Sequence, residues 1–113
     1  MKRSAADDRF SKYVRSRDDW TCQRCFAIFP EGRRGGLDCA HMFGRGKMNT
    51  RFDPENAAAL CFGCHRWLDT HPELKREFFL RRLGSRAFAA LEIRSNLTKK
   101  DVSIFELAGV EIP

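Results

Sequence analysis

The sequence predicts an α+β fold that is mainly helical, with a small β-hairpin in the middle of a single domain spanning residues 1–113. Three features lead to this expectation. Apolar residues recur at helical spacing near the amino terminus and again after residue 72. Two short apolar segments, joined by a glycine-rich loop, lie between those helices. Two CxxC pairs bracket the hairpin, and a domain this small often relies on a metal to hold its core together.

The first expected element is a short amphipathic helix over about residues 6–17. Phe10, Tyr13 and Val14 share one of its faces at helical spacing. Acidic residues come early in this segment and arginines come late, which is the order that interacts favourably with the helix dipole.

The central core, about residues 20–71, is expected to contain the hairpin. A tight cysteine turn forms in WTCQRC, and residues 37–43 are expected to be a strand. The long loop GRGKMNTRFDPEN follows, with a turn at its Asp-Pro step. AAALC is either a second short strand or the lead-in to a helix, which runs from Cys61 or Phe62 to about Thr70.

Helices are also expected over about residues 73–108. The first of them carries an apolar stripe, made up of Leu74, Phe78, Phe79 and Leu83. The second, SRAFAALEIRSN, turns Phe88 and Leu91 inward. TKKD, at residues 98–101, resembles a capping box ahead of a last helix.

The charge of the chain favours a polyanionic partner, most simply nucleic acid, because the formal net charge is +6. Most of this surplus falls in the glycine-rich segment 33–51, which has five basic residues and one acid. The basic residues are Arg33, Arg34, Arg45, Lys47 and Arg51. On charge alone, this basic segment is either a solvated flexible loop or a loop that lies against a phosphate backbone.

The compartment is expected to be the reducing cytoplasm. The start, MKRSAADDRF, lacks the apolar region of a secretory signal, and no apolar run is long enough to span a membrane. In a reducing compartment the five cysteines favour metal binding over disulfides.

Four of the cysteines have the spacing of a structural zinc site. Cys22 and Cys25 form one CxxC pair, Cys61 and Cys64 form another, and 35 residues separate the pairs. Two such pairs close a tetrahedral shell around Zn²⁺ and leave no open position for water. The alternatives are small buried hydrophobic residues or a redox couple. Cys39 is expected to be a core residue in a strand.

The histidines suggest a second kind of site. His65 and Asp69 are four residues apart on one expected helix, so their side chains share a face. A histidine nitrogen and a carboxylate oxygen on one face form half of a divalent-metal site, or else a surface pair without metal. His71 is expected at the surface or facing DNA rather than as a ligand.

The run CQRC … CAHMFGRG … FDPENAAALCFGCHRW resembles the HNH endonucleases, also called ββα-metal nucleases. Their signature is a histidine on the first strand, an asparagine before the second strand and a histidine on the helix. His41, Asn56 and His65 fill these positions, with separations of 15 and 9 residues. A zinc-clamped subset of the family has two CxxC knuckles around the same motif. The resemblance covers about residues 15–92, and its tail is similar to phage and prophage HNH proteins, including recombination nucleases.

This resemblance implies a ββα-metal core and a metal-dependent DNA endonuclease, with a structural Zn²⁺ and a catalytic Mg²⁺ or Mn²⁺. His41 would accept the proton of the attacking water, and Arg45 would grip a phosphate. His65 and Asp69 would hold the catalytic ion. Asn56 would brace the loop that orients His41, although in some family members it ligates the metal. Expected partners are DNA and either a second copy of the chain or phage replication, recombination or packaging proteins.

The sequence departs from the family at Ala40, where many members have an aspartate or histidine that ligates the metal. Asp38 is expected on the opposite side of the strand from His41, so His65 and Asp69 would be the main protein ligands. The alternative function is a zinc-stabilised DNA-binding module with a degenerate HNH site. A third possibility is a small zinc scaffold that binds protein.

Overall fold

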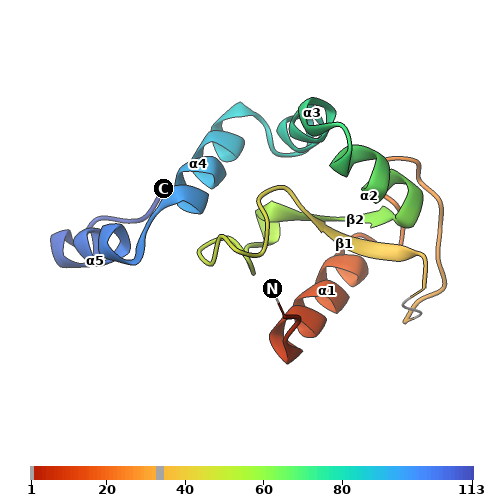
Figure 1. Ribbon diagram of the computed structural model, residues 1–113, viewed down its shortest axis with the longest axis horizontal. Coiled ribbons are helices and arrows are strands. Elements are labelled where there is room, and N and C mark those ends of the chain that lie inside the picture. Colours follow the sequence, from red (N-terminus) through yellow and green to blue (C-terminus); the bar gives the residue numbers. More distant parts are fainter. Residues whose placement is uncertain (1, 33–34) are drawn as a thin grey trace.

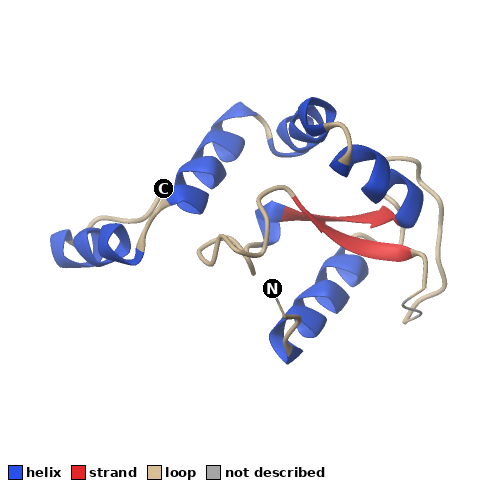
Figure 2. Ribbon diagram, viewed as in Figure 1, coloured by secondary structure: helices blue, strands red, loops and turns tan. Residues whose placement is uncertain are grey.

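The computed structural model of the chain describes residues 2–32 and 35–113. Within these residues it has five α-helices, one short 3₁₀ helix and a two-stranded antiparallel sheet (Figures 1 and 2). The elements in chain order are α1 (Ala5–Arg17), β1 (Leu37–His41), η1 (Pro54–Asn56), β2 (Ala57–Cys61), α2 (Phe62–Asp69), α3 (Pro72–Leu83), α4 (Ser85–Asn96) and α5 (Lys99–Ala108). The prediction of a mainly helical α+β fold is confirmed.

Helix α1 begins with a capping box, in which the Ser4 hydroxyl accepts from the Asp7 N–H and the Asp7 carboxylate accepts from the Ser4 N–H. Its apolar face is narrower than the sequence predicts. Val14 is fully buried, but half of the Tyr13 surface is exposed, and its ring lies 6.0 Å from the guanidinium of Arg17, one turn further on. The spacing therefore predicted the helix correctly and the orientation of Tyr13 incorrectly.

The two strands form the centre of the fold. Leu37 pairs with Cys61 and His41 with Ala57 in antiparallel register, so AAALC is a strand. The first strand ends at His41 rather than at residue 43, because the next two N–H groups donate to the backbone and side chain of Asn56. In Figure 1, α1 lies on one side of this hairpin and α2 on the other, and both pack against it.

The main core lies between the hairpin, the cysteine turn and α2. It combines Trp20, Leu37, Leu60 and Leu68 with two of the cysteines, so any metal held there ties these segments together. A second cluster joins the hairpin to α3 and α4 through Ala58, Phe79 and Phe88. The inward orientation of Phe88 and Leu91 is confirmed, whereas Leu74 at the start of α3 is exposed.

The carboxyl-terminal helix α5 lies far from the hairpin in Figure 1, and none of its side chains is buried. The predicted capping box at its start is confirmed, since the Thr98 hydroxyl accepts from the Asp101 N–H at 3.1 Å and the Asp101 carboxylate accepts from the Thr98 N–H at 2.9 Å. Among the described residues, no helix combines the length and the apolar character that crossing a membrane requires.

Candidate functional site

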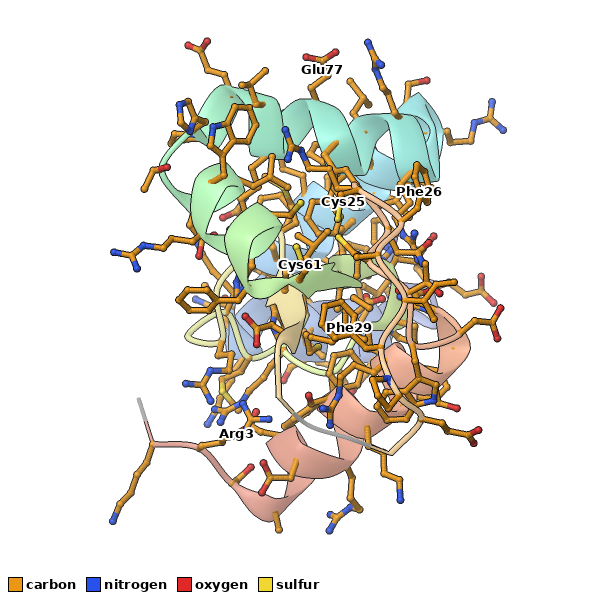
Figure 3. All side chains as sticks on the ribbon, turned by 90° about the vertical axis from the view of Figure 1, so that its right-hand side faces the viewer. Arg3, Cys25, Phe26, Phe29, Cys61 and Glu77 are labelled. Carbon is orange, nitrogen blue, oxygen red and sulfur yellow. The ribbon has the colours of Figure 1, made fainter. Side chains whose placement is uncertain are left out.

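The predicted cysteine quartet comes together in the structure. The Sγ atoms of Cys22, Cys25, Cys61 and Cys64 all lie within 4.8 Å of one another, and Figure 3 shows two of these residues, Cys25 and Cys61, side by side. The Cys25 and Cys61 sulfurs are 3.8 Å apart. In a tetrahedral zinc site with zinc–sulfur bonds of the usual length, two ligating sulfurs are roughly 3.8 Å apart. The quartet can therefore hold a metal ion such as Zn²⁺.

Local hydrogen bonds orient each cysteine pair. In the first knuckle, the Cys25 N–H points at the Cys22 sulfur at 3.5 Å. In the second, the Cys64 N–H points at the sulfur of Cys61, the residue that caps helix α2, at 3.4 Å. The CxxC spacing produces both contacts, because it places the N–H of the second cysteine under the sulfur of the first.

The thiols of the quartet influence one another's ionisation. Burial opposes ionisation of Cys22, but hydrogen bonds from backbone N–H groups, that of Cys25 among them, lower the pKa of its thiol to about 7. Burial raises the pKa of the Cys61 thiol to about 12, and the negative charge of Cys22 adds to this rise. Burial likewise raises the pKa of Cys64. A coordinated divalent ion offsets this repulsion and deprotonates the thiols, so the donor set fits Zn²⁺.

Asn56 is fully buried and braces the loop that follows β1. Its Oδ1 accepts from the Phe43 N–H at 2.9 Å, and its Nδ2 donates to the carbonyls of Phe43 and Thr50, both at 2.9 Å. The predicted bracing contacts are therefore present. The alternative role of metal ligand does not fit, because the amide is turned into the loop and shielded from solvent.

His41 is held by the same loop. Its Nε2 lies 3.0 Å from the backbone carbonyl oxygen of Arg51. A carbonyl only accepts, so Nε2 carries the proton and Nδ1 is the acceptor nitrogen of the neutral ring. Burial of the ring lowers the pKa of His41 below its ordinary value, and the positive charge of Arg45 adds to the effect, although the Arg51 carbonyl opposes it. At neutral pH the ring is therefore a neutral base.

His65 lies between two carboxylates. Its Nδ1 is 3.0 Å from Asp38 Oδ2, and its Nε2 is 3.4 Å from Asp69 Oδ2. If Nδ1 donates to Asp38, Nε2 is left as a free acceptor nitrogen on the side of Asp69. The imidazole nitrogen and a carboxylate oxygen are thus two potential ligand atoms on one face of α2.

Asp38, expected on the opposite side of the strand from His41, contacts His65, a partner that the sequence did not predict. Cys61, which pairs with Leu37, caps the helix that carries His65. The first turns of α2 therefore lie beside the start of β1 and place His65 over Asp38. The spacing between Asp38 and His41 predicts the strand face that Asp38 occupies. It does not predict that helix α2 and His65 pack against that residue.

A cavity of about 320 Å³ brings together His41, Arg45, His65 and Asp69, whereas Asn56 does not line it. Its lining includes Cys39, His41, Arg45, His65, Asp69 and Lys75. Two of these were not predicted to belong to the site. Lys75 comes from α3, which the motif does not cover, and Cys39 was expected in the core. Burial raises the pKa of the Cys39 thiol to about 12, and Cys39 does not belong to the cysteine cluster that could hold a metal ion.

The described basic residues of the basic segment 33–51, Arg45, Lys47 and Arg51, have different surroundings. Arg45 lines the cavity with its guanidinium 3.6 Å from the Asp7 carboxylate, and Lys47 is exposed with its ammonium 3.0 Å from Asn96 Oδ1. The prediction that Arg51 contacts DNA is wrong. Arg51 is buried, and its Nε donates to Asp7 Oδ1 at 2.9 Å, which ties the loop to helix α1. The predicted DNA contacts of residues 33 and 34 lie outside the described part of the chain.

His71 is exposed, as predicted, and does not line the cavity. Its ring stacks on Trp67 with the centroids 4.3 Å apart, and its Nδ1 lies 2.7 Å from the Trp67 carbonyl oxygen. Among the residues that the structure describes, the cysteine quartet is the only group of three or more ligating side chains placed to hold one metal ion.

Comparisons with protein-family models, with curated proteins and with solved structures found no match to this chain. The functional assignment therefore rests on the geometry of the cavity and on the sequence motif.

Proposed function

We propose that the protein is a metal-dependent DNA endonuclease of the HNH type, which hydrolyses a phosphodiester bond in the cavity between β1, α2 and α3. One observation carries the proposal. The same cavity holds a neutral histidine, His41, together with a histidine–carboxylate pair, His65 and Asp69. A DNA-binding or scaffold protein has no need for a half-buried neutral histidine at the same cavity as such a pair.

His41 acts as the general base in this proposal. Its Nδ1 takes a proton from the attacking water, and the Arg51 carbonyl on Nε2 stabilises the imidazolium that forms. Asn56 holds the loop that carries this carbonyl, so it acts as a positioning residue. Arg45 lies at the same cavity and donates to a phosphate oxygen.

His65 and Asp69 are the residues that would hold Mg²⁺ or Mn²⁺. When bound there, such an ion supplies positive charge that stabilises the developing oxyanions of phosphodiester hydrolysis. The cysteine quartet has a separate role in holding the fold, since four thiolates leave no position for water.

The test is incubation of the zinc-loaded protein with supercoiled plasmid in Mg²⁺, Mn²⁺ or EDTA. The wild-type protein should nick or cut the plasmid in Mg²⁺ or Mn²⁺ and should not cleave it in EDTA. His41→Ala should cut more slowly by about two to four orders of magnitude, the usual effect of losing a general base. His65→Ala and Asp69→Ala should abolish cutting, and His71→Ala serves as the control because its ring lies outside the cavity.

The products of plasmid cleavage also distinguish the alternative functions. Nicked circles, linear plasmid or preferential cutting of branched DNA distinguish a nicking, a double-strand and a structure-selective nuclease. DNA binding without cutting in every ion supports the zinc-stabilised binding module instead. If His41→Ala cuts as fast as wild type, the mechanism is wrong.

A further inference from the structure

The two oxygens of the Asp69 carboxylate have different partners. Oδ2 faces His65 Nε2 at 3.4 Å, where a divalent ion would bind, and Oδ1 accepts from the ammonium of Lys75 at 3.0 Å. The Lys75 side chain is only 20% exposed, and it lines the same cavity as His41. Asp69 is thus already neutralised by a cation that belongs to the protein.

We propose that Lys75 competes with the divalent ion for Asp69 and thereby makes binding of that ion depend on a phosphodiester in the cavity. This inference rests on the proposed function, because it assigns a regulatory device to the same site. It concerns the binding of the ion rather than the cleavage step.

Charge repulsion is the basis of the competition. An ion that bridges His65 and Asp69 would lie within a few ångströms of the Lys75 ammonium, a distance shorter than the screening length of physiological salt. Two protein ligands are also few for a divalent ion. In the absence of DNA the ion should therefore bind weakly.

A phosphodiester removes the repulsion. The lysine stem is long and flexible, so its ammonium can leave Asp69 and bind a phosphate oxygen in the same cavity. Arg45 already lines the wall at which that phosphate would enter. The freed carboxylate and the phosphate then offer oxygens to the ion. Because coupling between two ligands is reciprocal, the ion should in turn tighten DNA binding.

A purely structural role makes the opposite prediction. Lys75 lies in the first half of α3 and Asp69 ends α2, so their ion pair also connects two helices. If that were its only role, its removal would lower the stability of the protein and leave ion affinity no higher.

Titration calorimetry of the zinc-loaded protein with Mn²⁺, without DNA, tests the inference. Lys75→Met should bind Mn²⁺ at least about tenfold more tightly than wild type, since a nearby positive charge is lost. Adding Asp69→Asn to Lys75→Met should remove this gain. Lys100→Met is the matched control, because it deletes a lysine on the distant helix α5 and should leave the affinity unchanged.

A second titration adds a short duplex in the His41→Ala background, which slows cutting. The duplex should tighten Mn²⁺ binding about tenfold or more when Lys75 is present and much less in Lys75→Met. If Lys75→Met does not fold, a duplex that leaves Mn²⁺ affinity unchanged in the Lys75-containing protein still overturns the inference.

Lys75→Met that binds Mn²⁺ no more tightly than the protein with Lys75, or a duplex that leaves ion affinity unchanged, overturns the inference. Failure of the proposed function has a different signature. The titrations would then show the Lys75 effect while wild type leaves plasmid intact in every divalent ion.

Discussion

The carboxylate of Asp38 lies 3.0 Å from Nδ1 of His65, although the two residues are 27 positions apart in the chain. The contact joins the first strand to the helix that follows the second strand. It fixes the orientation of the imidazole ring and presents Nε2 to Asp69. A carboxylate behind a histidine ligand also raises the basicity of the ligating nitrogen.

Asp38→Asn should therefore weaken the site without unfolding the protein. The amide keeps the shape of the side chain but removes the charge, so plasmid cutting and Mn²⁺ affinity should fall by about 10- to 100-fold. Zinc content should stay at the wild-type value. Asp19→Asn, an exposed position with the same change in charge, is the control. Unchanged cutting by Asp38→Asn would mean that the contact has no part in catalysis.

The Asn56→Asp variant distinguishes two roles of Asn56, bracing the loop after β1 and ligating the divalent ion. The carboxylate cannot donate to the carbonyls of Phe43 and Thr50, so two buried acceptors lose their partner. The free energy of unfolding, measured by urea denaturation, should fall by about 2–5 kcal/mol. If Asn56 instead ligates the ion, the new carboxylate should preserve or strengthen Mn²⁺ binding. Asn96→Asp, at an exposed position, should change stability little.

The cysteine quartet should be required for the fold. Cys22→Ser or Cys64→Ser removes one thiolate from the cluster and should give unfolded or aggregated protein without zinc, because metal binding and folding are coupled in small metal-stabilised domains. Native mass spectrometry counts the bound zinc. Cys39→Ser should keep it, since Cys39 is not part of the cluster. Wild-type protein that carries no zinc would refute the assignment.

Acid should weaken the attachment of α1 to the loop before β2. The hydrogen bond from Arg51 holds the pKa of Asp7 well below its usual range, and the Ser4 N–H acts in the same direction. A depressed pKa in the folded state stabilises the protein above the unfolded value of about 4, and this stabilisation is lost as the pH falls towards the folded pKa. Urea midpoints should therefore drop for wild type below about pH 4.

Asp7→Asn should be less stable than wild type at neutral pH and should show a flatter dependence on pH. Asp8→Asn removes the neighbouring carboxylate, which is largely exposed and pairs with Arg3, and should keep the acid sensitivity of wild type. Equal pH profiles for wild type and Asp7→Asn would contradict the role of the Asp7–Arg51 pair.

The basic segment gives a prediction for DNA binding. Replacing Arg33 and Arg34 by alanine should lower affinity and flatten the salt dependence by about one unit in log–log slope for each lost phosphate contact. Fluorescence anisotropy at several salt concentrations measures the slope. Alanine at Arg81 and Arg86, both exposed on α3 and α4, is the charge-matched control. An unchanged slope would place the phosphate contacts elsewhere.

Much of the fold follows from local sequence. Helical spacing, the Thr98–Asp101 capping box and the short strand segments all depend on residues within a few positions of one another, and the structure confirms them. The geometry of each CxxC pair is also local, since each turn orients its own two sulfurs. That the two pairs meet was also predictable, because four thiolates in two pairs have few other uses.

The tertiary structure decided what each polar side chain contacts. Arg51 looked like a DNA contact and is paired with Asp7, 44 positions away. The contact between Asp38 and His65 was not predicted, and Lys75 reaches the cavity from helix α3. These pairings depend on strand register and on how α1, α2 and α3 pack against the hairpin. Local spacing fixes which face a residue occupies, but only packing brings a partner from another element to that face.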